Sequence, residues 1–390
     1  MADAVVIGAG ISGAATAYQL AKDGLDVVLL DRFSPAAMAS GWTLAGVRQS
    51  GRHAAELPLA RAAVAIWETL AEELEGETHY RRSGNLRVAR DDAEIAIIRG
   101  VVQDQASAGL DITLLPDNRA VRGVAPALSE RALLASYCTS DGSADPVATV
   151  QSFVRAAERR GATCRFGERA LVIETVAGRA RAVVTDKSRI ATRRVVIAAG
   201  IFGNELLKSF GVHVPLQVPV ATVLRSAPGA RVLEPVISTA TATCTGRQEH
   251  DGRWRVTNGA EAWRGTLIEE KGERGLPRPR VNPTAASMVD VVTRFGALVP
   301  AFREAAIEQS WAGLLDLAPD ALPVLDAVPG CEGAFLAMGF SGHGFCLGPV
   351  TGKILSDFVQ DRPVDLPLEP FALSRFQTSA SATAPATLHG

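Results

Sequence analysis

The chain opens with an apolar strand that runs directly into a glycine-rich turn. Residues 4–7 are Ala-Val-Val-Ile, and Gly8, Gly10 and Gly13 follow at the spacing G-x-G-x-x-G. A second apolar run, residues 27–30, ends at the acidic residue Asp31. Strand, turn, helix, strand and acid in this order predict a βαβ unit that binds a dinucleotide.

Each glycine of this turn has a separate physical role. Gly8 allows a sharp turn, Gly10 lets the backbone approach a pyrophosphate, and Gly13 lets the new helix pack closely on its strand. Asp31 follows Gly13 by 18 residues, where a carboxylate accepts hydrogen bonds from ribose hydroxyls and disfavours a 2′-phosphate. The motif alone leaves NAD and FAD open. Its predicted cofactor-binding residues are Gly8, Gly10, Ile11, Ser12, Gly13, Asp31 and Arg32.

Size and composition exclude several classes of protein. The 390 residues suggest about two domains. A net charge of −2 with 47% hydrophobic residues favours neither a nucleic-acid-binding surface nor a disordered chain. The five cysteines are scattered without a CxxC spacing, so we expect no disulfide framework and no metal site. No apolar run is long enough to cross a membrane and no signal peptide is recognised, which favours the cytoplasm.

The rest of the chain alternates helical and strand patterns. We expect a loop over 34–52, helical structure over 54–75 and 91–108, and a helix over 147–160 with Asp145 as N-cap and Pro146 in its first turn. Short strands over 164–166, 170–175 and 180–185 predict a layer of hairpins, whereas the apolar run 194–200 is typical of a buried parallel strand. Strands are also expected at 83–89, 133–138 and 335–338, and a helix at 348–359.

These patterns predict an α/β fold with a Rossmann-like domain and an inserted, mostly antiparallel sheet domain of α+β type. Residues 214–308 are rich in Val, Thr, Pro and Gly and contain a predicted hairpin turn at 250–252, as expected for that sheet. The predicted cofactor domain is discontinuous, over 1–82, 145–213 and 309–376. The substrate domain then comprises 83–144 and 214–308, and 377–390 is a flexible tail.

Four segments, in order, resemble the FAD-dependent D-amino-acid oxidase superfamily. They are VVIGAGISG at 5–13, ASGWTLAGVRQSGR at 39–52, VVIAAGIFGNELL at 195–207, and LAPDALPVLD at 317–326 with MGFSGHGFCLGPVTG at 338–352. Within the superfamily the chain is similar to the sarcosine oxidase β-subunit, glycine oxidase and D-hydroxyproline dehydrogenase branch. The resemblance implies FAD, and a second glycine-rich turn near the end of the chain agrees with it, because an isoalloxazine needs backbone donors far from the pyrophosphate turn.

The resemblance also implies further contacts to FAD. Ser40 and Gly41 would contact the pyrophosphate, Ala170 the adenine, and Ala199 with Gly200 would close over the cofactor. The flavin ring would lie along a third set of residues. These are Gly46, Val47, Arg48, Gly313, Gly339, Ser341, Gly342, His343, Gly344, Phe345 and Cys346.

Three residues, Arg48, Arg52 and His343, are predicted to take part in catalysis. The guanidinium of Arg48 would hold a substrate carboxylate or stabilise a flavin anion. Arg52 and His53 follow closely and are either part of the site or solvated loop charges. His343 or His53 would accept a proton, although His343 in a flavin loop is also compatible with a hydrogen-bonding role alone.

Departures from the family pattern bear on the identity of the substrate and on how the flavin is attached to the protein. Leu315 stands where glycine and D-amino-acid oxidases have a carboxylate-binding arginine, so the anchor is expected at Arg48 or at an arginine of the sheet domain. Gly313 and Ala144 stand near the residues that tether flavin in sarcosine oxidases, which predicts noncovalent FAD and no covalent FMN. Cys346 replaces a lysine of monomeric sarcosine oxidases and mildly favours a dehydrogenase over an oxidase.

The expected reaction is oxidation of the CH–NH bond of a small amino acid or secondary amine. A hydride would pass to flavin N5, and the imine would hydrolyse. Sarcosine, D-hydroxyproline and opines are the first candidates, and D-amino acids with primary amines the second. A flavin subunit of a hetero-oligomer and a nicotinamide dehydrogenase are also compatible with the sequence. The electron acceptor, oxygen or another, and a homo-oligomeric state stay open; neither nucleic acid nor a membrane is an expected partner.

Overall fold

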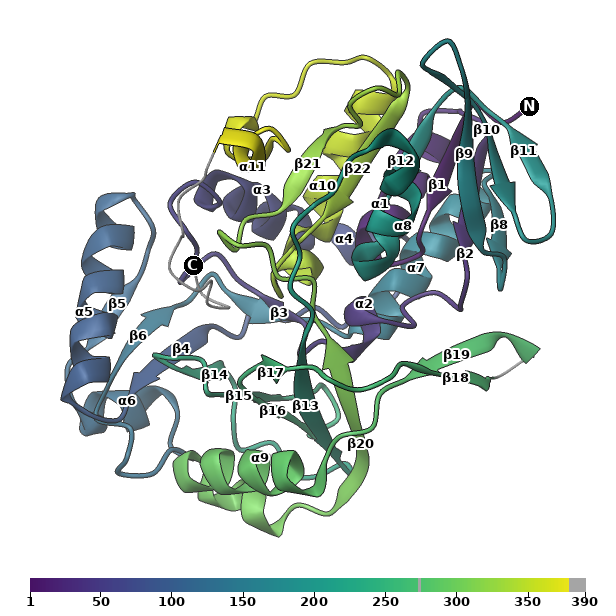
Figure 1. Cartoon of the computed structure of the whole chain (residues 1–390). Helices are drawn as coiled ribbons and strands as arrows, with labels where there is room; N and C mark the ends of the chain where they lie inside the picture. Colours follow the sequence, from purple (N-terminus) through teal and green to yellow (C-terminus); the bar gives the residue numbers. More distant parts are fainter. Residues whose placement is uncertain (273–274, 379–390) are drawn as a thin grey trace.

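The computed structural model describes residues 1–272 and 275–378, and its core is built on two large sheets (Figure 1). The first sheet has six strands in the order β21-β22-β12-β1-β2-β8. Neighbouring strands are parallel except for β21, which is antiparallel to β22. The strands are β1 (Ala4–Ile7), β2 (Val27–Asp31), β8 (Thr163–Phe166), β12 (Val195–Ile197), β21 (Val324–Ala327) and β22 (Ala334–Met338).

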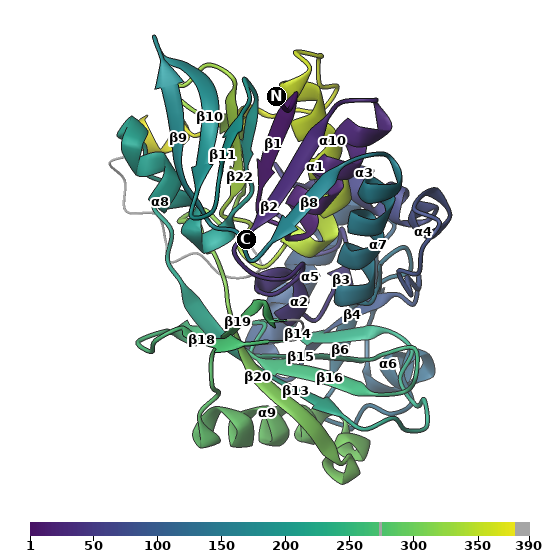
Figure 2. The ribbon, with the colours of Figure 1, turned by 90° about the vertical axis from the view of Figure 1, so that its right-hand side faces the viewer.

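Both faces of this parallel sheet are covered, which explains its unbroken apolar strands. Val6 and Leu29 pack on the helical face, whereas Val5 and Leu30 pack on the opposite face. On one side lie the helices α1 (Ile11–Lys22), α3 (Leu57–Trp67), α7 (Pro146–Arg159) and α10 (Gly344–Val359) (Figure 2). On the other side lie α8 (Gly203–Leu207) and a three-stranded antiparallel sheet of β9 (Ala170–Val176), β10 (Arg179–Thr185) and β11 (Arg189–Ala191).

The second large sheet is antiparallel except where β14 meets β4. Its order is β17-β13-β16-β15-β14-β4-β6-β5, with β20 also paired to β13. The strands are β4 (Asn85–Ala89), β5 (Thr113–Leu115), β6 (Leu134–Cys138), β13 (Pro219–Ser226), β14 (Val236–Thr239), β15 (Cys244–Gln248), β16 (Trp254–Asn258), β17 (Glu261–Ala262) and β20 (Ile307–Leu314).

One face of the second sheet is closed by helix α9 (Ala285–Leu298). Phe295 of α9 packs edge-on against Trp254, with ring centroids 5.8 Å apart, and against Phe302 at 5.2 Å. Such edge-to-face contacts add to the area that these rings bury. The helices α5 (Asp92–Ser107) and α6 (Asn118–Val124) lie beside β5 and β6 at one end of the sheet (Figure 1). The other face of the sheet is thereby left to the site.

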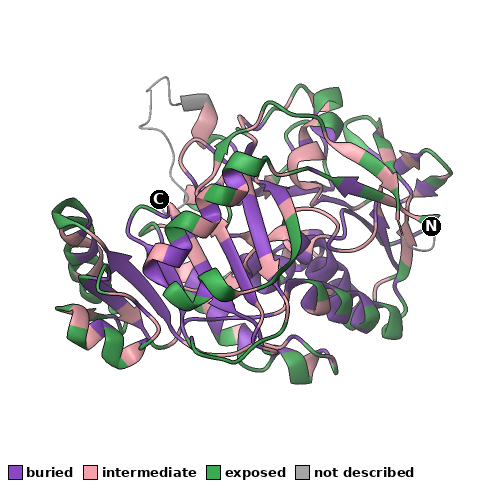
Figure 3. Ribbon diagram, turned by 90° about the horizontal axis from the view of Figure 1, so that it is seen from below, coloured by how far each residue is buried: buried purple, intermediate pink, exposed green. Residues whose placement is uncertain are grey.

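Smaller elements complete the described chain. Buried residues concentrate in the strands and on the inward sides of the helices, as Figure 3 shows. The hairpin of β18 and β19 projects from the molecule (Figure 1). The remaining elements are α2 (Ala39–Trp42), β3 (Gly46–Val47), α4 (Leu70–Glu73), β7 (Gly142–Ser143), β18 (Ile268–Lys271), β19 (Pro277–Arg280), α11 (Arg375–Thr378) and short 3-10 turns at 200–202, 208–210, 300–304 and 369–371, with those at 200–202 and 208–210 flanking α8.

The predicted fold class is confirmed, and several elements match closely. Asp145 caps α7 by accepting a hydrogen bond from the Ala148 backbone N–H at 2.8 Å, with Pro146 as the first helical residue. The hairpin that joins β15 and β16 turns at residues 249–253 as predicted. The exact domain boundaries stay a prediction, although β13 and β20 carry the chain between the two large sheets (Figure 1).

Other expectations were wrong or incomplete. Strand β8 does not belong to the hairpin layer, because it pairs in parallel with β2 at the edge of the six-stranded sheet. Helix α10 begins at Gly344, inside the predicted turn, and the predicted loop 34–52 contains α2 and β3. Helix α9 was not predicted. Of the predicted tail, 377–378 belong to α11 and 379–390 lie outside the described residues. Within the described ranges, no helix is long and apolar enough to cross a membrane.

Candidate functional site

The turn between β1 and α1 has the geometry that its glycines predict. Gly8 has φ +109°, and a Cβ there would lie 2.2 Å from the Ala198 carbonyl oxygen. A Cβ on Gly13 would lie 1.9 Å from the Gly8 carbonyl oxygen, so this residue allows the close contact of helix and strand. A Cβ on Gly10 would meet only Ser40 Oγ, at 3.1 Å. Gly10 therefore allows the turn to lie close to the Ser40 hydroxyl, and a side chain here would be crowded by it.

A long cavity starts at this turn and reaches the face of the second sheet that lies opposite α9. It passes the loop before α3, the end of β12 and the N-terminus of α10. Most of the predicted site residues line it. They are Gly8, Gly10, Ile11, Ser12, Asp31, Arg32, Ser40, Gly46, Arg48, Arg52, Ala170, Ala199, Gly200, Gly313, Gly342, His343, Gly344 and Phe345.

Asp31 lies at the first end of the cavity, held by the backbone. Its Oδ2 accepts a hydrogen bond from the Ala9 N–H at 2.6 Å, and its Oδ1 accepts one from the Phe33 N–H at 2.7 Å. Each carboxylate oxygen has further acceptor capacity for a ribose hydroxyl. Arg32 beside it lies over the rings of Phe33 and Phe202, 4.9 and 4.4 Å from their centroids. This end of the cavity offers the contacts that an adenosine group needs.

The glycine-rich turn before α10 is held by Asp316. Its Oδ2 accepts from the Gly339 N–H at 2.9 Å, and its carbonyl accepts from the Ser341 N–H at 2.9 Å. Burial raises the pKa of Asp316 to about 6. Ser341 has φ +55°, and its hydroxyl donates to the Gly339 carbonyl at 3.1 Å. Gly339 and Ser341 thus shape the turn, while Gly342 to Phe345 face the cavity.

Six predicted site residues are not part of the described cavity wall: Gly13, Gly41, Val47, Gly339, Ser341 and Cys346. A Cβ on Gly41 would lie 2.0 Å from the Ala36 carbonyl oxygen, which makes this glycine a packing residue. Cys346 is buried, and burial raises the pKa of its thiol to about 11. His53, the alternative base, is exposed, and its Nδ1 accepts from the Ala55 N–H. Their predicted roles toward cofactor or substrate stay predictions.

Three arginines gather beside the inner part of the cavity. Arg48 Nη1 and Arg87 Nη1 both lie within 3.1 Å of the position that a Cβ on Gly51 would occupy. Buried Arg52 Nη1 and Arg87 Nε have no hydrogen-bond partner among the described residues. Burial, and after it the charge of Arg52, lowers the pKa of Arg87 to about 10. Like charges this close are stabilised when an anion lies between them.

The loop that carries Arg48 and Arg52 is fixed by side chains from the turn after β6 and from α5. Asp141 accepts hydrogen bonds from the Gln49 N–H at 2.8 Å and from the Ser50 hydroxyl. Gln105 of α5 accepts from the Gly51 N–H at 2.9 Å. Among the described residues, Asp141 and Glu56 are the carboxylates that act most strongly on Arg48. Among the described residues, the three arginines outnumber these two carboxylates, which favours an anionic ligand.

His343 lies next to this cluster and is bonded to Glu56. His343 Nδ1 is 2.9 Å from Glu56 Oε2, and the two side chains are 2% and 0% exposed. Arg52 Nε lies 3.3 Å from Glu56 Oε1. Although burial alone would raise the pKa of Glu56, His343 and Arg52 lower it to about 2. Because Arg52 carries a permanent charge, the carboxylate stays ionised at neutral pH even when His343 is a neutral imidazole.

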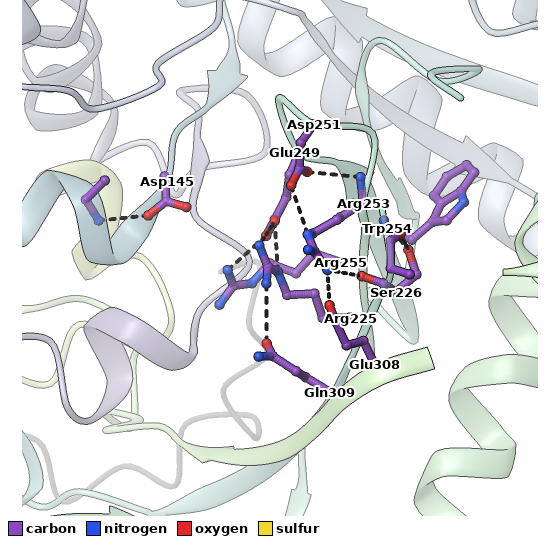
Figure 4. A network of polar contacts seen from close by, with 12 residues as sticks. Asp145, Arg225, Ser226, Glu249, Asp251, Arg253, Trp254, Arg255, Glu308 and Gln309 are labelled. Atoms are coloured by element: carbon purple, nitrogen blue, oxygen red, sulfur yellow. Dashed lines mark hydrogen bonds and ion pairs between the residues drawn. The ribbon is translucent and has the colours of Figure 1, made fainter. Parts of the chain in front are cut away.

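Two other arginines, on strands of the second sheet, donate hydrogen bonds to the loop 41–44. Arg247 on β15 donates to the Leu44 carbonyl at 2.6 Å and to the Ala144 carbonyl at 2.8 Å. Arg255 on β16 donates to the Gly41 carbonyl at 2.9 Å and to Glu249 at 3.1 Å. Figure 4 shows that Glu249 also binds Arg225, so that the carboxylate joins two guanidinium groups. These arginines hold the loop 41–44 and are not placed as substrate anchors.

Sequence reasoning missed Glu56, Arg87 and Asn85. Glu56 lies at the start of α3, where an acid is unremarkable, and only its i, i+4 spacing from Arg52 hinted at a pair. Asn85 lines the cavity and Arg87 follows on the same face of β4. Their importance depends on β4 lying behind the loop 48–52, a contact between distant segments that no local pattern predicts.

The donor set fits FAD. A glycine turn that lines the cavity at Gly8 and Gly10, a carboxylate at the ribose position and a cavity that continues to a second glycine-rich turn match the length of that cofactor. A family model described as FAD-dependent oxidoreductase (DAO) matches residues 3–358. The chain belongs to this family. The predicted superfamily, the FAD cofactor and the expectation of an amine or amino-acid oxidoreductase are thereby confirmed.

Several known relatives of this DAO-family flavoenzyme match over nearly their whole length. An uncharacterized oxidoreductase of Bacillus subtilis, YurR, is 27% identical over 94% of this chain and 97% of its own. Hydrogen cyanide synthase subunit HcnC of Pseudomonas aeruginosa is 26% identical over 98% of each chain. The crystal structure of L-proline dehydrogenase from P. horikoshii superposes with a TM-score of 0.87 at 23% identity, over 96% of this chain and 98% of that one. This last likeness shows the fold.

Proposed function

We propose that this flavoenzyme oxidises the CH–NH bond of a small amino acid or secondary amine that carries a carboxylate. The observation behind the proposal is the arginine cluster of Arg48, Arg52 and Arg87, which faces fewer carboxylates than guanidinium groups and lies beside His343. A carboxylate bound to the cluster would place the amine near the glycine-rich turn before α10. FAD, when bound, accepts the two electrons of the C–H bond as a hydride at N5.

Each residue has a proposed task in this reaction. The arginine cluster binds and orients the carboxylate, since a guanidinium is permanently charged and matches a carboxylate in a bidentate way. Arg48 and Arg87 replace the anchor that Leu315 cannot supply. His343 accepts a proton from the substrate amine, because an amine must be neutral before it is oxidised. The predicted cofactor-binding residues hold FAD without a covalent bond.

The wall of the cavity indicates the size of the substrate. Its sheet face carries small side chains, among them Ala221, Val223, Ser238 and Thr245. Small side chains leave room for a substrate larger than glycine. The secondary or cyclic amino acids predicted from sequence, such as sarcosine, D-hydroxyproline and opines, fit this wall, and the name of the L-proline dehydrogenase neighbour points the same way.

Anaerobic reduction of the bound flavin tests the proposal directly. The purified holoprotein is mixed with sarcosine, L-proline, D-proline, D-hydroxyproline, glycine or D-alanine, and the loss of the oxidised flavin band is followed. Pyrrolidine, which is proline without its carboxylate, is the matched control. We expect at least one carboxylate-bearing amine to reduce the flavin and pyrrolidine to be far slower. Equal rates for proline and pyrrolidine would contradict the carboxylate anchor.

A second candidate is a flavin-bearing subunit of a hetero-oligomeric dehydrogenase. It is supported by the relative HcnC, which is described as a subunit and covers 98% of this chain. In that case the lone chain would bind FAD but would be reduced by amines only together with its partner. Reduction of the lone chain at a rate that supports turnover argues against this candidate.

A further inference from the structure

The contact between His343 and Glu56 determines which imidazole nitrogen carries the proton. Nδ1 of His343 is 2.9 Å from Glu56 Oε2. An ionised carboxylate only accepts hydrogen bonds, so Nδ1 must be the donor. In a neutral imidazole the other nitrogen, Nε2, is then the acceptor. The pair therefore selects one tautomer of His343.

The charges around the pair keep Glu56 ionised and His343 neutral. Arg52 Nε lies 3.3 Å from Glu56 Oε1 and supplies a permanent positive charge. Burial, and after it the charge of Arg52, lowers the pKa of His343, and Glu56 opposes this shift. Among the described residues, the charged groups that act most strongly on His343 are Glu56, Arg52 and Arg48. A neutral imidazole at physiological pH is able to take up a proton.

The pair is also held rigidly at the cavity. His343 is the N-cap of α10 and lines the cavity, whereas Glu56 is the N-cap of α3. The two helices are tied together further along, because Trp67 Nε1 donates to the Cys346 carbonyl at 2.8 Å. The imidazole thus has a fixed partner on a neighbouring helix.

We propose that Glu56 is a positioning residue that fixes the Nδ1–H tautomer of His343, so that Nε2 accepts the proton released by the substrate ammonium group. In this step an N–H bond of the ammonium breaks and an Nε2–H bond forms. The amine becomes neutral, and the resulting imidazolium is stabilised by the Glu56 carboxylate. The identity of the proton donor, a substrate ammonium group, rests on the proposed function. The tautomer of His343 rests only on its contact with Glu56.

The first experiment measures the tautomer without any substrate. ¹⁵N-histidine is incorporated into the holoprotein, and His343→Gln identifies the His343 signals by their loss. We expect a neutral Nδ1–H imidazole in the wild-type protein and loss of this preference in Glu56→Gln. Glu94→Gln is the matched control, since buried Glu94 of α5 pairs at the same i, i+4 spacing with Arg90, which precedes that helix, and lies outside the cavity wall. An Nε2–H imidazole in the wild-type protein would overturn the proposal.

The second experiment measures the consequence for the reaction. The rate of anaerobic flavin reduction at saturating amine is recorded against pH, with the amine of the panel that reduces the flavin fastest. Glu56→Gln should lower the maximal rate by about 10- to 100-fold and move its ascending limb to lower pH, since the imidazolium loses its carboxylate. Glu56→Asp should recover part of the rate, and Glu94→Gln should leave the profile unchanged.

The outcomes separate this inference from the proposed function. If no amine of the panel reduces the flavin, the proposed function fails while the ¹⁵N spectra still decide the tautomer. If an amine reduces the flavin and Glu56→Gln retains the wild-type rate and pH profile, the proposed function stands and the role of Glu56 is refuted. If the Glu56→Gln protein does not fold, the wild-type tautomer and the Glu56→Asp variant decide the question.

Discussion

Arg87 projects from β4 toward the loop that carries Arg48 and Arg52, and its Nε is buried without a partner in the described chain. Replacing it with Met keeps the apolar part of the side chain and removes the charge. Because a hydrogen bond to a charged group contributes about 1.5–3 kcal/mol, Arg87→Met should raise the dissociation constant for the carboxylate substrate about 10- to 150-fold. Rapid-mixing kinetics of flavin reduction at increasing substrate concentration measure this dissociation constant. A variant in which only the limiting rate of flavin reduction changes would contradict an anchoring role.

Gly13 gives a second test on a single residue. A Cβ there would lie 1.9 Å from the Gly8 carbonyl oxygen, and this backbone atom cannot move without opening the turn. Gly13→Ala should therefore destabilise the fold by about 1–3 kcal/mol and weaken FAD binding. Gly100→Ala is the control, because a Cβ at this α5 glycine meets nothing within 4 Å. It should stabilise the helix by up to about 1 kcal/mol in urea unfolding.

Single residues were predictable where a local motif fixes the backbone. The turn at Gly8 to Gly13 and the acid Asp31 have the expected geometry because strand, turn and helix are neighbours in sequence. Glu56 and Arg87 were not predictable. The role of each depends on contacts with segments that are far away in the sequence. Glu56, for example, contacts His343, which lies 287 positions further along the chain.

Among the elements, the turn between β22 and α10 depends on Asp316. Burial raises its pKa to about 6 from 3.8, so the folded protein binds this proton more tightly than the unfolded chain. The resulting stabilisation is complete below pH 3.8 and is lost as the pH rises to about 6. The free energy of unfolding of the wild type, relative to Asp316→Asn, should fall over this range and level off above it. A difference that rises with pH would contradict the assignment.

The second sheet fixes the loop 41–44 through Arg247. Its guanidinium donates to the carbonyls of Leu44 and Ala144, and its removal leaves buried acceptors without donors. Arg247→Met should weaken FAD binding about 10-fold or more, measured by flavin release on dilution. Arg253→Met is the control, because Arg253 pairs with Asp251 and Glu308, as Figure 4 shows, and is not part of the described cavity wall. Equal flavin release from both variants would argue against the contact.

Elements were predicted best where one pattern decides them. Asp145 and Pro146 marked the start of α7 correctly. Strand β8 was assigned to the wrong layer, because a short strand has the same sequence pattern whether it joins a hairpin or the edge of a parallel sheet. Helix α9 was missed because its surroundings are rich in Pro, Thr and Gly, although Thr284 caps it by accepting from the Ser287 N–H.

At the scale of the whole molecule, the two large sheets border the cavity that runs from the glycine-rich turn before α1 to the turn before α10. The described cavity wall includes Gly313 and the turn before α10 but no cysteine or histidine other than His343. We therefore expect FAD to be noncovalent. Acid precipitation should leave the yellow colour in the supernatant, and colour retained in the protein pellet would contradict this expectation.

The architecture was predictable because the family motifs occur in order along the chain, whereas the inner wall of the cavity was not. Asn85 on β4 and Thr245 on β15 line one cavity only because β14 joins these strands within the sheet. That pairing brings together residues separated by more than a hundred positions, and no spacing in the sequence encodes it.

A crystal structure of the holoprotein would decide whether one cofactor joins the two glycine-rich turns. We predict one FAD molecule, with its pyrophosphate at the backbone of Gly10 and Ile11 and its isoalloxazine between the loop that carries Arg48 and the turn that carries His343. A carboxylate ligand soaked into these crystals should contact the arginine cluster. An isoalloxazine placed away from both Arg48 and His343, or a carboxylate bound elsewhere in the cavity, would contradict this arrangement.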